Sequence, residues 1–224
     1  MPPPSRYQYI FKLCGIPQQT YREEDFLCGK SKLSSGLVFH FGYWVGDIYT
    51  AHVKNKRDIF RFRETDNAVS DKYLKQIEAA EASVSLHVRR GDYIGSGYVN
   101  LGKEYYSAAV QHFRDALNEP VFFCFSNDIE WCRSHPEELG FELTKDNVCF
   151  VSGVSVTDGF SDLRLMSSCR HNIIANSTFS LWGALLNTYD GKTVIAPKRY
   201  FSENYQKKMQ KIEAQYCPNE WIRM

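Results

Sequence analysis

Short apolar runs alternate with stretches of helical character between Ser83 and Pro197. The runs resemble strands buried on both faces, and the stretches between them carry the three- and four-residue apolar spacing of amphipathic helices. This alternation predicts an α/β fold with a doubly wound parallel sheet. The expected strands are 36–44, 83–89, 121–125, 148–151, 171–175 and 193–196, the last in the chain, and the expected helices are 64–82, 106–117, 127–133, 162–169, 177–187 and 202–215.

The strand that begins at Ser83 runs into a charged turn. Apolar residues at 84, 86 and 88 alternate with polar ones, so His87 and Arg89 lie side by side on one face. Arg90 and Asp92 follow at the exit of the strand, which is where ligands bind in open α/β sheets. Two guanidinium groups there suit a phosphate-bearing ligand, because each offers a planar fork of donors. The alternative is that the arginines and Asp92 simply pair with one another at a surface turn.

Two further strand ends carry polar residues. Asp128 follows the strand 121–125, where its carboxylate could accept from a nucleoside, or could only cap the next helix. Ser177 and Thr178 stand where the strand 171–175 leads into a helix, and free backbone N–H groups at such a point favour an anion. An ordinary N-cap by Asn176 or Ser177 is the other interpretation, and the two are compatible. Together these strand ends predict one site for a diphosphate-bearing ligand.

Several classes of protein are disfavoured. The net charge of +1 leaves no basic stripe for general nucleic-acid binding. Seven cysteines without CxxC spacing argue against zinc and against a disulfide framework, and favour reduced thiols in a cytosolic protein. No bilayer-spanning run and no signal peptide is present. The sequence also contains no GxGxxG, P-loop or DxD motif, and neither a metal site nor a bound cofactor is expected.

Three ordered motifs resemble the alpha-1,2-fucosyltransferases of glycosyltransferase family 11, the bacterial members in particular. The resemblance covers roughly residues 36–201. The motifs are HVRRGDY at 87–93, FSNDIEWC at 125–132, and DLRLMS at 162–167 continued by IANSTFSLWGA at 174–184.

The resemblance implies a GT-B-like enzyme, built from two facing Rossmann-like domains. Such an enzyme would move L-fucose from GDP-fucose to the 2-hydroxyl of a galactoside, with inversion and without a metal. Either His87 or Asp92 would be the general base, or the reaction would need none. The residues that the resemblance assigns to the donor are Arg89 and Arg90 on the diphosphate, Ser177, Thr178 and Phe179 near the phosphate and fucose, and Asp128 as a candidate for the nucleoside.

Members of this family usually begin with a glycine-rich segment of the GGLGNQ type, which this sequence lacks. Residues 1–82 are therefore expected to be the remnant of an amino-terminal, acceptor-side domain, and residues 83–224 the Rossmann-like domain that binds GDP-fucose. The expected partners are GDP-fucose and a galactose-terminated glycan, with no nucleic acid. The expected location is cytoplasmic, with peripheral contact at the inner face of a membrane left open. A nucleotide-sugar-binding module without catalysis is the alternative function.

Overall fold

A computed structural model describes most of the chain. The described residues are 18–22, 37–41, 47–51, 53, 56–62, 67–95, 97–153, 159–203, 213 and 215–224. Side chains are described from Tyr49 onward within these ranges. The predicted helix at 202–215 falls almost entirely outside the described residues.

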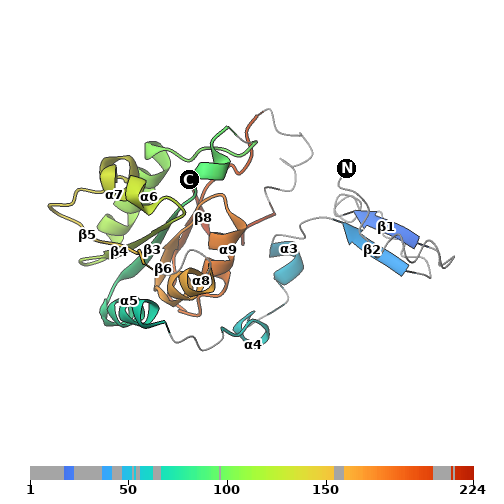
Figure 1. Ribbon diagram of the computed structural model, residues 1–224, viewed down its shortest axis with the longest axis horizontal. Coiled ribbons are helices and arrows are strands. Elements are labelled where there is room, and N and C mark those ends of the chain that lie inside the picture. Colours follow the sequence, from blue (N-terminus) through green and yellow to red (C-terminus); the bar gives the residue numbers. More distant parts are fainter. Residues whose placement is uncertain are drawn as a thin grey trace.

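Six parallel strands form the main sheet (Figure 1). They lie in the order β5-β4-β3-β6-β7-β8, so the chain moves outward from β3 in one direction and then returns to build the other half beside it. This is the order of a doubly wound sheet, with its switch point between β3 and β6. The strands are β3 (Ser83–Val88), β4 (Val121–Ser126), β5 (Asn147–Phe150), β6 (His171–Ile173), β7 (Val194–Ala196) and β8 (Ile222–Arg223).

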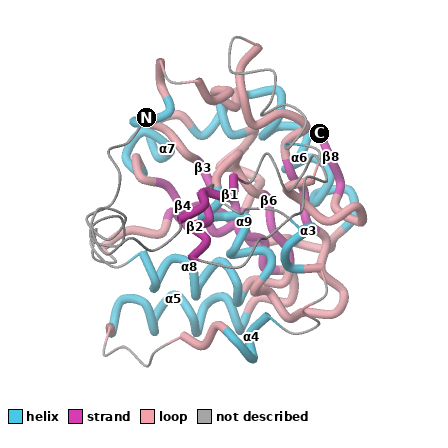
Figure 2. Tube along the Cα trace, turned by 90° about the vertical axis from the view of Figure 1, so that its right-hand side faces the viewer, coloured by secondary structure: helices cyan, strands magenta, loops and turns pink. Residues whose placement is uncertain are grey.

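Helices cover both faces of this sheet. On one face, α6 (Lys103–Ala116), α7 (Ile129–Ser134) and the 3₁₀ helix η2 (Pro136–Leu139) contribute to one apolar core. On the other, α5 (Ala68–Ala79) and α8 (Gly159–Ser168) lie side by side, and α9 (Thr178–Leu185) packs on α8 (Figure 2). The α/β class and the doubly wound parallel sheet predicted from the sequence are confirmed.

The alternation in β3 decides which side chains meet which helices. Val84, Leu86 and Val88 pack into the core beneath α6, and burying each contributes about 1.5–3 kcal/mol. On the opposite face the Ser85 hydroxyl accepts a hydrogen bond from Asn172 Nδ2 at 2.7 Å. The Ser85 hydroxyl is therefore buried but satisfied, and His87 is the next member of this face toward the carboxyl end.

The described residues before position 67 form four short elements. Strands β1 (Gln18–Arg22) and β2 (Leu37–Phe41) pair in parallel and lie apart from the main sheet in Figure 1. Two single-turn helices follow, α3 (Asp47–Thr50) and α4 (Lys56–Ile59). The boundary expected at 82/83 stays a prediction, as does a second domain facing the first. Helix α5 precedes that boundary and packs on the sheet through Ile77 and Ala80.

One part of the main sheet differs from expectation. The strand expected to be last, 193–196, is followed by β8 at the carboxyl end of the chain. Strand β8 is only two residues long, too short to give a periodic signal. The chain after Arg90 also makes one 3₁₀ turn, η1 (Gly91–Tyr93), in which Gly91 has a φ of 66° that a residue with a side chain rarely adopts.

Candidate functional site

A pocket of about 630 Å³ opens at the carboxyl ends of the central strands. It lies beside the switch point between β3 and β6, where open α/β sheets bind their ligands. Its lining comes from the exits of β3, β4 and β5 and from the first residues of α8 and α9. The residues that line it and carry the argument below are His87, Arg89, Asp92, Tyr93, Tyr98, Asp162, Ser177, Thr178 and Phe179.

Arg89 is the cation of this pocket. It follows β3 on the same face as His87, and its Nη2 donates to Asp92 Oδ2 at 2.8 Å. The Arg89 Nε is buried and has no hydrogen-bond partner within the described part of the chain. A ligand or a water in the pocket could supply the acceptor for this donor. The Arg90 Nε, outside the pocket, likewise has no hydrogen-bond partner among the described residues. From the sequence, the charged turn could form ion pairs at the surface or bind a phosphate. In the structure Arg89 and Asp92 do form an ion pair, and both residues line the pocket.

His87 is buried at the floor of the pocket, with its ring centroid 5.7 Å from that of Phe179. Burial, together with the Arg89 guanidinium, lowers the pKa of His87 to about 3. The imidazole is therefore neutral at physiological pH and is a weak base. Its Nδ1 has no hydrogen-bond partner among the described residues.

The start of α9 forms the opposite wall. Ser177 is its N-cap, with Oγ accepting from the Phe179 N–H at 3.4 Å, and Thr178 is exposed at the first helical position. Asn176 holds the turn in place, because its Nδ2 donates to the carbonyls of Val99 and Tyr200. The dipole at this helix end favours an anion.

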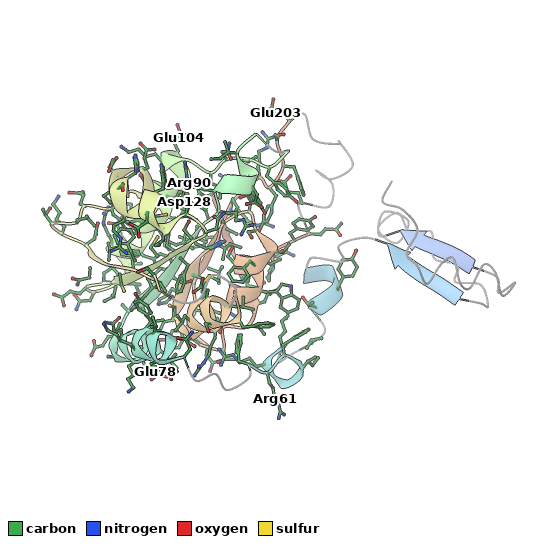
Figure 3. All side chains as sticks on the ribbon, in the orientation of Figure 1. Arg61, Glu78, Arg90, Glu104, Asp128 and Glu203 are labelled. Atoms are coloured by element: carbon green, nitrogen blue, oxygen red, sulfur yellow. The ribbon has the colours of Figure 1, made fainter. Side chains whose placement is uncertain are left out.

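Arg90 and Asp128 lie outside the lining of the pocket, next to each other in Figure 3. The Arg90 Cζ stacks 3.5 Å from the centroid of the Trp131 ring, and its Nε is 3.7 Å from Asp128 Oδ2. Asn127 bonds both the N–H and the carbonyl of Arg90, each at 3.0 Å. Asp128 caps α7 by accepting from the Trp131 N–H, which is the capping role considered from the sequence. A part for either residue in donor binding stays a prediction.

Three of the lining residues to which the sequence assigned no role are Asp162, Tyr93 and Tyr98. Asp162 places a carboxylate near the start of α8, and the DLRLMS motif marked its position without giving it a role. Tyr93 and Tyr98 stack at 4.3 Å with an angle of 12° between their rings. Tyr98 stands in a glycine-rich loop without periodicity, so no local signal could have identified it.

Among the described residues, no three His, Cys, Asp or Glu side chains gather as a metal site would require, and the five cysteines in these ranges are free thiols. None of the helices described is long and apolar enough to cross a bilayer.

The family model of glycosyl transferase family 11 matches residues 18–224. An alpha-1,2-colitosyltransferase of Escherichia coli is 33% identical over 195 residues, which are 84% of this chain and 63% of that protein. The O-antigen biosynthesis glycosyltransferase WbnK of Escherichia coli is 35% identical over 143 residues, 61% of this chain and 45% of that protein. Galactoside alpha-(1,2)-fucosyltransferase 1 of Aotus azarae is 32% identical over 145 residues, 62% of this chain and 37% of that protein.

The chain thus spans less than two thirds of the length of each of these relatives. Among solved structures, the beta Kdo 2,7 transferase KpsC of Thermosulfurimonas dismutans aligns with 88% of this chain and 70% of its own. The TM-score is 0.32 at 11% identity, a similarity that supports no conclusion about the fold.

Proposed function

This chain belongs to glycosyltransferase family 11, and we propose that it binds GDP-L-fucose and transfers fucose to the 2-hydroxyl of a galactoside. The transfer would invert the anomeric carbon and need no metal. The names of the relatives divide between colitosyl and fucosyl transfer, and galactoside and alpha-1,2 linkage occur among them. The acceptor would be a galactose-terminated glycan.

The observation that carries this proposal is that Arg89 and the start of α9 line the same pocket, which lies at the switch point. A diphosphate between them would receive charge-assisted bonds from the guanidinium and N–H donors from the helix. These groups meet the charge that grows on GDP as the glycosidic bond breaks, which is the task a metal performs elsewhere. Arg89 remains only 30% exposed, so its charge is weakly screened by water.

The other end of the pocket suits the nucleoside. Phe125 and Val151 supply apolar walls at the ends of β4 and β5, and Asp162 supplies a carboxylate. A guanine base offers an N–H and an amino group on one edge, and a carboxylate accepts from both. We therefore propose Asp162 as a candidate for the base of the nucleotide, alongside Asp128, which the sequence suggested.

The chemistry forms a bond from the acceptor oxygen to the anomeric carbon and breaks the bond to the β-phosphate oxygen. The hydroxyl proton must leave the acceptor as this happens. His87 is disfavoured as the acceptor of this proton because the pKa of the imidazole is lowered. Asp92 is the remaining candidate of the two, a carboxylate with a side chain 57% exposed that Arg89 holds in place.

A nucleotide-sugar-binding module without catalysis is a second candidate. It would need only the donor pocket, whose lining the structure brings together at the carboxyl ends of β3, β4 and β5. Both candidate functions require the donor site, but only the transferase would move fucose to a galactoside.

The cytoplasmic location, with peripheral contact at a membrane, also belongs to the proposal. The membrane contact is supported by an exposed apolar patch formed by Ile59, Phe60 and Phe160. Arg61, labelled in Figure 3, lies beside this patch. Such a patch with a basic rim suits an anionic lipid surface. Co-sedimentation with anionic vesicles, lost in Phe160→Asp, would support this contact, and equal sedimentation of both proteins would contradict it.

Titration calorimetry of the chain with GDP, in EDTA, tests the donor site. We expect GDP to bind, and Arg89→Ala to weaken binding by about a hundredfold, because a charge-assisted bidentate contact is lost. Arg199→Ala is the matched control, since Arg199 is an exposed arginine that pairs with Glu203 outside the pocket. Normal GDP binding by Arg89→Ala would sink the assignment.

A further inference from the structure

Four side chains form a continuous row, and three of them line the pocket. The Arg89 Cζ lies over the Tyr93 ring at 5.6 Å, Tyr93 stacks on Tyr98 at 4.3 Å, and Tyr98 packs against Phe201 at 5.3 Å. Phe201 is 3% exposed and belongs to the core beneath β7. The row therefore connects the pocket's arginine to a rigid part of the molecule.

The outer members of the row are fixed by backbone bonds. Tyr98 and Phe201 form an antiparallel bridge, the Val99 N–H donates to the Tyr200 carbonyl at 3.0 Å, and the Ser202 N–H donates to the Gly97 carbonyl at 2.9 Å. These bonds hold the loop after η1 against the segment after β7. The Tyr98 ring thus stands at a set position beside Tyr93.

Tyr93 also reaches the second anion-binding element. Its hydroxyl donates to the Asn176 carbonyl at 3.2 Å and interacts with the Ser177 side chain. Burial raises the pKa of Tyr93, so the hydroxyl keeps its proton and remains a donor. One residue therefore contacts Arg89 through its ring and the start of α9 through its hydroxyl.

Resting on the proposed function, we propose that Tyr93 is a positioning residue that sets the span between Arg89 and the α9 amino end, and so shapes the site for a diphosphate. The ring restricts the guanidinium, whose long side chain would otherwise lose rotamer freedom on binding. The hydroxyl restricts the turn at Asn176 and Ser177. Ligand binding then orders fewer groups, which raises affinity without a contact from Tyr93 to the ligand.

The test is a set of GDP titrations on single variants. Tyr93→Leu removes ring and hydroxyl, and should weaken GDP binding about tenfold, the size of a lost cation–π restraint. Tyr93→Phe keeps the ring and should recover part of that loss. Tyr189→Leu is the matched control, because Tyr189 is also stacked under an arginine, Arg170, at 5.4 Å but away from this pocket.

A double-mutant cycle separates positioning from general damage to the fold. Tyr93→Leu in an Arg89→Lys background should cost clearly less than tenfold, because lysine lacks the planar group that the ring restrains. An equal loss in both backgrounds would overturn the proposal, and so would wild-type affinity in Tyr93→Leu. Absence of GDP binding to the wild-type chain would instead contradict the proposed function.

Discussion

Arg89 and Arg90 are neighbours in sequence but meet different surroundings. Side chains alternate along an extended chain, so Arg89 continues the His87 face of β3 into the pocket, while Arg90 turns toward α7. There the Trp131 ring and Asp128 already hold its guanidinium. Of two adjacent arginines, one therefore lines the pocket and the other packs on a helix.

This division predicts unequal effects of two alanine substitutions. Arg90→Ala should weaken GDP binding less than tenfold and lower the free energy of unfolding by about 0.5–2 kcal/mol, as the stack on Trp131 is lost. Arg89→Ala should do the reverse, with a large loss of affinity and little loss of stability. GDP titration and urea unfolding of both variants check this, and equal losses of affinity would contradict it.

His87 predicts a pH dependence of stability. Its pKa falls from 6.5 to about 3 on folding, so between these values the unfolded chain takes up a proton that the folded chain does not. The free energy of unfolding must then decrease as the pH falls through this window. From pH 7 to pH 5 the wild type should lose about 2 kcal/mol more than His87→Gln.

Urea unfolding at the two pH values measures this difference. His112→Gln is the control, because His112 is only partly buried on the outer side of α6 and lies away from the pocket. It should lose stability as the wild type does. Parallel pH profiles for His87→Gln and the wild type would show that the imidazole is not buried in the neutral form.

At the scale of elements, the amino end of α9 lines the pocket and the rest of the helix packs in an apolar cluster. Thr178 is exposed at its first position and lines the pocket. Thr178→Asp adds a negative charge that the helix dipole stabilises by about 0.3–1 kcal/mol, but that charge repels a diphosphate. We expect unchanged or higher stability together with at least tenfold weaker GDP binding.

Thr178→Asn has nearly the same shape as Thr178→Asp without its charge, and so is the matched control. It should retain most of the GDP affinity. If the two variants bind GDP equally well, no anion lies at this end of α9.

Most elements around the site were predictable from local patterns. The apolar run at 121–125 and the alternation from Ser83 specify strands strongly, since each buries a consistent face. The partner of Arg90 was not predictable, because its guanidinium stacks on Trp131, forty-one residues later in the chain. Tyr98 escaped for the same reason, as its place is set by Phe201 across a long-range bridge.

At the scale of the whole molecule, residues that follow β7 and precede β8 pack against the wall of the pocket. Strand β8 pairs with β7, and the segment after β7 carries Tyr200 and Phe201, which pack with Trp221 in one apolar cluster. Through Phe201 this cluster reaches Tyr98 and the pocket wall. The carboxyl-terminal residues thus contribute to a site formed largely by the central strands.

Trp221→Ala tests this support. Trp221 is 6% exposed, and truncating a buried tryptophan typically costs about 3–5 kcal/mol of the free energy of unfolding. Because the loss lies behind Tyr200, we also expect faster amide exchange at Val99 and Ser202, whose N–H groups bond across the loop. Glu220→Ala, at the exposed neighbouring position, should change neither quantity. Loss of stability with unchanged exchange at both amides would mean that the pocket wall holds its place without the carboxyl-terminal strand.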